Sequence, residues 1–274
     1  MKQIKLNNGE LVSALGQGTW HMGENSAEFN REVAALRLGL DLGMNLIDTA
    51  ELYADAELVV AEAIKGRRAD AFIVSKVLPS NASYQGTITA CERSLKRLQI
   101  ECLDMYLLHW PGLTPVEETL EVFQTLVEAG KIRHYGVSNF DYYETQLACQ
   151  QPGGKAIATN QLLYNLNKRG IEWDLLPWCR KQGVPVMAYS PLDEGRLQHP
   201  VLNIIAQRHQ ATAAQVALAW LLQQDSVIAI PKAVKPEHIK QNAAAAELVL
   251  SAQDLHEIEQ AFPAPTQAQP LHVY

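Results

Sequence analysis

The chain has 274 residues, of which 47% are hydrophobic and 19% charged, and its formal net charge is −7. A chain of this size can bury a full hydrophobic core, but an acidic sequence without a basic stripe is not expected to bind nucleic acid. Its first residues lack the apolar core of a signal peptide and no run approaches the roughly 18 apolar residues that cross a bilayer, which predicts a cytoplasmic protein without a membrane partner.

A short hairpin is predicted at the start of the chain. QIKL at residues 3–6, an Asn-Asn-Gly turn and the apolar pair Leu11 and Val12 form its arms, because Asn-Gly supplies the positive φ angles of a tight turn. Apolar strands then alternate with amphipathic helices, the first four helices being expected over residues 28–42, 57–64, 87–98 and 116–128. The eight expected strands are SALGQG, NLID, AFIVSK, DMYLLH, IRHYGVS, AIATNQ, PVMAYS and VIAIPK.

Eight strand–helix units, spaced by roughly 25 to 40 residues, match a (β/α)8 barrel of about 250 residues. The competing arrangement is a doubly wound sheet, which usually carries a GxGxxG sequence after an early strand. The nearest candidate, residues 16–21, lacks the third glycine, and no linker rich in Pro, Gly or Ser divides the chain. The sequence therefore predicts an α/β protein with one TIM-barrel domain over residues 1–274 and an N-terminal β-hairpin. Residues 263–274 should lie over the barrel or be partly mobile.

The cysteines indicate no covalent or metal framework. They are far apart and form no CxxC pair, at Cys91, Cys102, Cys149 and Cys179. This spacing predicts reduced thiols, with neither a disulfide framework nor a structural zinc site. No metal site is predicted elsewhere.

Four polar side chains stand at or just after the ends of predicted strands. Asp48 closes NLID, Lys76 closes AFIVSK and His109 closes DMYLLH, while Tyr53 follows Asp48 by five residues. Each residue alone is typical of a cap or a solvated strand edge. However, the carboxyl ends of parallel strands in a barrel face one mouth, where ligands bind. Their serial placement predicts a common site.

These residue types fit proton donation to a carbonyl. A tyrosine has a pKa of about 10 and needs a nearby cation to stabilise its phenolate, which Lys76 can provide. A carboxylate such as Asp48 can keep a buried lysine in its ammonium form, and His109 can orient the carbonyl or share in the proton transfer. Reduction also needs a cofactor, because no side chain donates hydride.

The chain closely resembles the aldo-keto reductase family from the hairpin to about residue 242. The matching segments are GQGTW (16–20), NLIDTAELY (45–53), SK (75–76), DMYLLHWP (104–111), GVSNF (136–140), NQLLYN (160–165), YSPL (189–192) and IPK (230–232). The resemblance implies a catalytic set with Tyr53 as the acid, consisting of Asp48, Tyr53, Lys76 and His109. The implied substrate-binding residues, which border an apolar pocket, are Trp20, Tyr53, His109 and Trp110.

The resemblance also implies a nicotinamide cofactor and its contacts. Tyr189 would stack on nicotinamide, and Lys232 would meet the adenosine phosphate at an anion site reinforced by a helix N-terminus. The residues that would hydrogen-bond the carboxamide are Ser138, Asn139 and Gln161. Those that would approach the pyrophosphate are Ser190 and Leu192. The remaining implied contacts are Gly18, Thr19, Trp20, Asp48, Ala233, His238, Gln241 and Asn242.

Positions around the implied adenosine phosphate depart from the family pattern. A serine is frequent at Ala233, an arginine at His238 and a glutamate at Gln241. Unlike a guanidinium, a histidine is mostly neutral at about pH 7 and makes no bidentate contact. We therefore predict that NADPH is preferred, by a smaller margin over NADH than an arginine would give. Asp193 stands where a small residue is common, and is expected to pair with Arg196.

The mouth of the barrel is expected to be open. Only Trp110 to Thr114 connect His109 to the next helix, and the C-terminal segment is brief. This favours small aldehydes, α-dicarbonyls such as methylglyoxal and aryl aldehydes over bulky steroids as the carbonyl substrate. The helical surfaces carry no pattern that sets the oligomeric state, and a monomer or weak homo-oligomer is expected.

Two other functions fit parts of the pattern. Lys76 could form a Schiff base in a barrel aldolase or isomerase acting on a sugar phosphate, which leaves Tyr53, Tyr189 and the IPK segment without a purpose. Alternatively, a barrel that binds a nicotinamide cofactor could act as an accessory or sensing subunit. The presence of all four implied catalytic residues disfavours that role.

Overall fold

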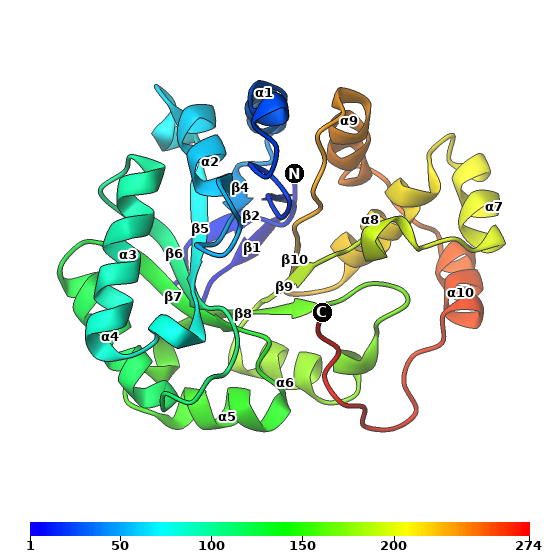
Figure 1. Cartoon of the computed structure of the whole chain (residues 1–274). Coiled ribbons are helices and arrows are strands. Elements are labelled where there is room, and N and C mark those ends of the chain that lie inside the picture. Colours follow the sequence, from blue (N-terminus) through cyan, green and yellow to red (C-terminus); the bar gives the residue numbers. More distant parts are fainter.

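Eight parallel strands form a ring that is surrounded by helices (Figure 1). The computed structural model describes residues 1–274, and the strands follow one another around the ring in chain order. They are β3 (Gln17–Gly18), β4 (Leu46–Asp48), β5 (Phe72–Val77), β6 (Leu103–Leu108), β7 (Ile132–Ser138), β8 (Ile157–Leu163), β9 (Val186–Tyr189) and β10 (Val227–Ala229). Each of the eight predicted strands overlaps one of them.

The ring is closed by pairing between its first and last strands. Leu15, just before β3, forms a parallel bridge with Ala229 at the end of β10. The amide of Ala229 donates to the Ala14 carbonyl, and the amide of Gly16 donates to the Ala229 carbonyl, both at 2.8 Å. A closed ring has no sheet edge, so the predicted (β/α)8 barrel is confirmed and the doubly wound alternative is wrong.

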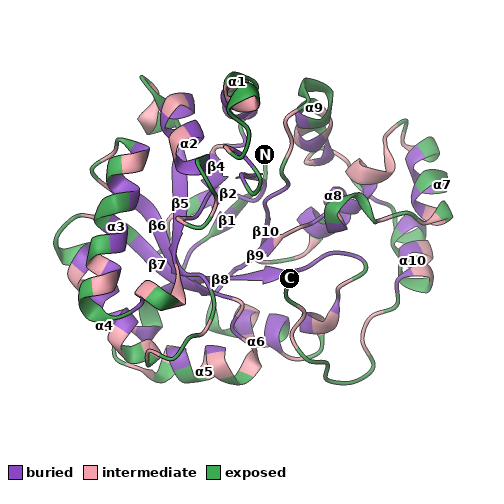
Figure 2. Ribbon diagram, viewed as in Figure 1, coloured by how far each residue is buried: buried purple, intermediate pink, exposed green.

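The strands are buried on both faces, as the purple ribbons in Figure 2 show. Every residue of β5 and of β6 is buried, because barrel side chains point either into the interior or against the helix layer. Apolar residues fill most of these positions. Ser75 and Lys76 in β5 are buried polar exceptions near the carboxyl end of the strand. Lys76 points into the interior, whereas Ser75 points towards the helix layer.

The predicted N-terminal hairpin is confirmed. β1 (Gln3–Lys5) and β2 (Leu11–Ser13) pair antiparallel, and Gly9 takes the positive φ of 94° in the turn. The Asn7 side chain donates to the backbone oxygens of Lys155 and Ile157 at 3.1 and 2.9 Å. Since Ile157 begins β8, the hairpin lies against the amino end of the barrel and leaves the carboxyl end free.

Ten α-helices pack around the strands with their outer faces exposed (Figure 2). The predicted helix over residues 116–128 agrees in both ends, whereas the third helix begins at Tyr84 rather than Thr87 because the Ser83 side chain caps it. No helix combines the length and hydrophobicity needed to cross a bilayer. The helices are α1 (Phe29–Asp41), α2 (Ala56–Ile64), α3 (Tyr84–Leu98), α4 (Val116–Glu128), α5 (Tyr142–Gln150), α6 (Leu175–Gln182), α7 (Pro200–Arg208), α8 (Ala213–Gln223), α9 (Pro236–Ala245) and α10 (Ala252–Ala261).

The segment after α10 runs back across the mouth of the barrel. Its end lies in the middle of the ring in Figure 1, near β8 and β9. The ring centroid of Tyr274 is 6.1 Å from that of Trp20 and 6.2 Å from that of Tyr189. The prediction that this segment lies over the barrel is thus confirmed, and the mouth is more covered than the short loops alone indicate.

Candidate active site

The carboxyl ends of three neighbouring strands bring the four predicted catalytic side chains together. Asp48 ends β4, Lys76 lies near the end of β5 and His109 directly follows β6. Tyr53 lies in the loop after β4, and its ring centroid is 5.7 Å from that of His109. These positions form one cluster at the mouth that the N-terminal hairpin leaves free.

Lys76 and Asp48 form a buried ion pair. Lys76 Nζ donates to Asp48 Oδ2 at 2.7 Å, to the Thr49 carbonyl at 2.8 Å and to Tyr53 Oη at 3.4 Å. Three acceptors match the three hydrogens of an ammonium group. The other Asp48 oxygen accepts from Gln161 Nε2 at 2.7 Å. Burial lowers the pKa of Lys76 and raises that of Asp48, and their mutual attraction opposes both shifts. The hydrogen bonds fit an ammonium donor and a carboxylate acceptor, so we assign the charged form to both groups.

Tyr53 is held as a neutral phenol. Burial, with a further contribution from the Asp48 carboxylate, raises the pKa of Tyr53 well above its usual value. This direction differs from the expectation that Lys76 would favour the phenolate, because burial and the Asp48 carboxylate both favour the neutral phenol. Since Tyr53 Oη accepts from Lys76 Nζ, its own hydrogen is free to be donated to another oxygen.

A side chain of α3 forms hydrogen bonds with the turn that carries Tyr53. Arg97 Nη2 donates to the Ala54 carbonyl at 2.7 Å and to Asp55 at 3.1 Å, while its Nε donates to buried Glu57 at 3.0 Å. Glu57 also accepts from Ser75 Oγ at 2.9 Å, next to Lys76. Arg97 and Glu57 therefore fix the turn relative to β5. Sequence reasoning missed both residues, since their pairing joins separate helices.

His109 is a neutral imidazole. Burial, together with the nearby Lys76 charge, lowers the pKa of His109 to about 2. Its Nδ1 atom is buried without a hydrogen-bond partner. A lone pair without a partner is better tolerated than a donor without one, so the proton belongs on Nε2. That nitrogen is the one that can donate to a substrate oxygen.

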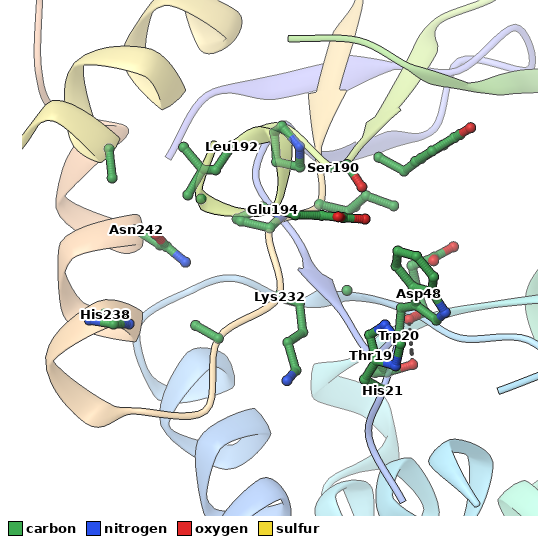
Figure 3. A pocket seen from close by; sticks show the side chains of 18 of the residues that line it. Thr19, Trp20, His21, Asp48, Ser190, Leu192, Glu194, Lys232, His238 and Asn242 are labelled. Atoms are coloured by element: carbon green, nitrogen blue, oxygen red, sulfur yellow. Dashed lines mark hydrogen bonds between the residues drawn. The ribbon is translucent and has the colours of Figure 1, made fainter. Parts of the chain in front are cut away.

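A cavity of about 500 Å³ begins beside Tyr53 and Asp48. It extends between Ser190, Leu192 and Glu194 on one side and Lys232 on the other, towards His238 and Asn242 (Figure 3). The predicted cofactor and substrate residues among its lining are Gly18, Thr19, Trp20, Asp48, Tyr53, Tyr189, Ser190, Leu192, Lys232, Ala233, His238, Gln241 and Asn242. Residues from opposite ends of the sequence thus line one elongated space.

Three predicted carboxamide contacts lie behind this lining. Ser138 Oγ donates to the Gln161 carbonyl at 2.9 Å, and Asn139 Oδ1 accepts from the Tyr189 hydroxyl at 2.9 Å. Together with the bond from Gln161 to Asp48, these contacts connect β7, β8 and β9 to the catalytic cluster. Trp110 is also outside the lining, with its ring centroid 4.8 Å from that of His109.

The segment between β9 and α7 supplies residues that sequence reasoning missed. Glu194 lines the cavity and pairs with Arg196 at 3.2 Å. The expected contact between Asp193 and Arg196 is present at 3.5 Å, but Asp193 also accepts from Asn167 at 2.9 Å. The other lining residues that were not predicted as contacts are His21, Pro191, Gly195, Thr212, Ala214, Ile230 and Pro231, of which Pro191, Ile230 and Pro231 stand in the matched YSPL and IPK segments.

The far end of the cavity can hold an anion. Lys232 lines it and forms no salt bridge with the protein. Helix α9 begins nearby at Pro236, and no side chain caps its first turn. An uncapped helix N-terminus and an unpaired ammonium group both attract phosphate. The cavity therefore joins the Tyr53 phenol at one end to an unpaired lysine and an uncapped helix N-terminus at the other.

Comparison with known proteins connects this arrangement to a family. The model of the aldo/keto reductase family matches residues 14–262. Methylglyoxal reductase YeaE of Escherichia coli K12 is 52% identical over 272 residues, covering 96% of each chain. Glyoxal reductase of Bacillus subtilis is 36% identical over 260 residues, covering 93% of this chain and 91% of that protein.

A solved structure agrees over the whole length. An aldo/keto reductase from Klebsiella pneumoniae, in complex with NADP and acetate, is 46% identical and has a TM-score of 0.96, covering 100% of this chain and 99% of that one. Sequence match and fold match therefore extend over the same barrel. The chain belongs to the aldo/keto reductase family of oxidoreductases.

Proposed function

We propose that this protein reduces small aldehydes, α-dicarbonyls and ketones to alcohols with NADPH, using Tyr53 as the general acid. The observation that carries the proposal is a phenol that accepts a hydrogen bond from a buried ammonium group and faces a cavity lined by an unpaired lysine. The names of the relatives, methylglyoxal reductase and glyoxal reductase, support the reaction. The NADP in the Klebsiella pneumoniae structure supports the cofactor.

The chemistry of the cavity fits a nicotinamide dinucleotide. Tyr189 offers an aromatic face close to Tyr53, and Lys232 with the N-terminus of α9 offers positive charge at the far end. When bound, the cofactor supplies the hydride that no side chain can donate. Ser138, Asn139 and Gln161 would hold the carboxamide of the nicotinamide through their amide and hydroxyl groups.

Tyr53 protonates the carbonyl oxygen as reduction proceeds. The oxygen becomes alkoxide-like and is then a stronger base than a phenolate, so the transfer is favourable despite the raised pKa of Tyr53. Lys76, at 3.4 Å, stabilises the phenolate that remains, and Asp48 keeps Lys76 charged and in place. His109 donates from Nε2 to orient the carbonyl, because a pKa of about 2 prevents it from serving as a cationic acid.

Small carbonyl compounds fit the accessible end of the cavity. Trp20 and Trp110 are each 38% exposed and offer flat apolar surfaces beside the catalytic cluster. Tyr274 stacks against Trp20 and covers part of the mouth. This arrangement favours short or flat substrates, in agreement with the dicarbonyls methylglyoxal and glyoxal in the names of two relatives.

The two rival functions have less support. Schiff-base chemistry needs a deprotonated, accessible amine, whereas the Lys76 side chain is 0% exposed and is paired with Asp48. A purely cofactor-binding role leaves the free hydrogen of Tyr53 and the neutral Nε2 donor of His109 without a use. Both observations favour catalysis.

One assay tests the proposed reaction directly. The purified chain, mixed with NADPH and methylglyoxal, an aryl aldehyde or a keto acid, should lower the absorbance of the reduced cofactor and form the corresponding alcohol. The two aldehydes are expected to be the better substrates. No oxidation of NADPH with any of these carbonyl compounds, despite measurable cofactor binding, would leave only the accessory-subunit function.

Replacing Lys232 by methionine is expected to weaken NADPH binding by roughly tenfold to a hundredfold, the scale of one charge-assisted hydrogen bond. Binding of NADH should change little, because NADH lacks the additional phosphate on the adenosine ribose that distinguishes NADPH. Fluorescence titration of both cofactors measures the two effects. Lys240→Met removes a charge from the exposed face of α9 and serves as the matched control, with no change for either cofactor.

His238→Arg is the complementary variant. A permanently charged guanidinium, which can make a bidentate contact with a phosphate, should increase the preference for NADPH when it replaces the imidazole, with no comparable gain in the binding of NADH. If Lys232→Met weakened the binding of NADPH and of NADH by the same factor, this end of the cavity would not hold the additional phosphate on the adenosine ribose of NADPH.

A further inference from the structure

The Tyr274 side chain binds to residues 190–196, the segment that forms one wall of the cavity. Its hydroxyl accepts from Arg196 Nη2 at 2.7 Å and donates to Asp193 Oδ1 at 3.0 Å. The direct contact between these two charged groups is longer, at 3.5 Å from Arg196 Nη2 to Asp193 Oδ1. The Arg196 guanidinium also lies over the Tyr274 ring, 5.4 Å from its centroid. The Tyr274 hydroxyl thus forms hydrogen bonds with Arg196 and Asp193 at the same time.

The segment held by Tyr274 has an unfavourable backbone. Ser190, Asp193 and Glu194 have φ angles of 45°, 49° and 54°, and Gly195 follows at 81°. Left-handed backbone at three non-glycine residues persists only where surrounding contacts maintain it. Asp193 is 5% exposed and accepts from Asn167 and Tyr274, while Asn165 Nδ2 donates to the Ser190 carbonyl at 2.9 Å. These contacts hold the segment to the rest of the molecule.

This segment is part of the cofactor cavity. Ser190, Leu192 and Glu194 line the wall opposite Lys232 (Figure 3). The Tyr274 ring, in turn, lies 6.1 Å from Trp20 and 6.2 Å from Tyr189. Tyr274 therefore contacts the aromatic side chains at the catalytic end and, through its hydroxyl, the wall that continues towards the phosphate end.

We propose that Tyr274 is a positioning residue that keeps the 190–196 wall closed against the bound cofactor and thereby slows cofactor release. The inference rests on the proposed use of this cavity for NADPH. A released wall relieves backbone strain and opens one side of the cavity, whereas the Asp193–Tyr274–Arg196 bridge opposes that opening. Its effect is on the cofactor dissociation rate, and the proton transfer by Tyr53 is independent of it.

Tyr274→Phe tests this role, because it removes only the bridging oxygen and keeps the ring. Release of NADPH, followed by stopped-flow fluorescence with excess NADP+ as competitor, should become roughly tenfold faster. The rate of NADPH oxidation in a single turnover with methylglyoxal should be unchanged. Tyr143→Phe is the matched control, since Tyr143 is 76% exposed and lies on α5 outside the site, and should change neither rate.

A double-mutant cycle separates the bridge from other effects. Arg196→Met should accelerate release by itself, and combining it with Tyr274→Phe should add little, because both remove the same bridge. Unchanged release in Tyr274→Phe, or a change only in the KM for the carbonyl substrate, would overturn the inference while leaving the proposed reaction intact. Failure of the unmodified chain to bind NADPH would overturn both.

Discussion

Replacing Tyr53 by phenylalanine is expected to lower turnover at least roughly hundredfold, the usual scale for loss of a general acid. The variant keeps the ring beside His109 and the ion pair of Lys76 with Asp48, and loses only the oxygen that donates the proton. Cofactor affinity should change little. Steady-state turnover at saturating NADPH and fluorescence titration of the cofactor measure the two quantities.

The matched control is Tyr106→Phe. Tyr106 is fully buried, its hydroxyl has no partner, and its ring packs against Phe123 away from the cavity. Turnover of this variant should equal that of the unmodified chain. If Tyr53→Phe keeps more than about a tenth of the turnover, Tyr53 is not the acid. His109→Gln would then become the informative variant, because the His109 imidazole is the remaining group of the cluster that could donate a proton to the carbonyl oxygen.

The barrel and hairpin could be predicted because local sequence periodicity determines them. Strands buried on both faces need continuous apolar runs, such as those before Asp48 and His109, and each is followed by an amphipathic helix. The turn before Glu10 carries its own Asn-Gly signal. Closure through Leu15 and Ala229 follows from the number of units rather than from either segment.

The clustering of Asp48, Tyr53, Lys76 and His109 could be predicted because strand ends in a parallel barrel share one mouth. The residues could be predicted, but their protonation behaviour could not. The pKa of Tyr53 is raised by burial and by the Asp48 carboxylate, and both effects depend on the folded surroundings of the phenol. Contacts between distant segments also have no local signal. Tyr274 meets Asp193 across 81 positions, and Arg97 meets Ala54 across 43.

Replacing Lys76 by methionine is expected to abolish most turnover and to lower the free energy of unfolding by about 3 to 5 kcal/mol. The methionine fills a similar volume, but the Asp48 carboxylate remains buried without its cation, and Tyr53 loses the donor that stabilises its phenolate. Urea denaturation measures the stability, and NADPH oxidation measures the activity.

The stability loss should also depend on pH. An uncompensated buried Asp48 has a folded-state pKa above its unfolded value, so the native state takes up a proton and the difference from the unmodified chain shrinks as pH falls. The double variant Lys76→Met/Asp48→Asn should recover part of the stability at neutral pH, because it buries no charge. Its turnover should stay low. Recovery of turnover together with stability would mean that Lys76 only supports the fold, whereas recovery of stability alone separates its catalytic charge from its structural pairing.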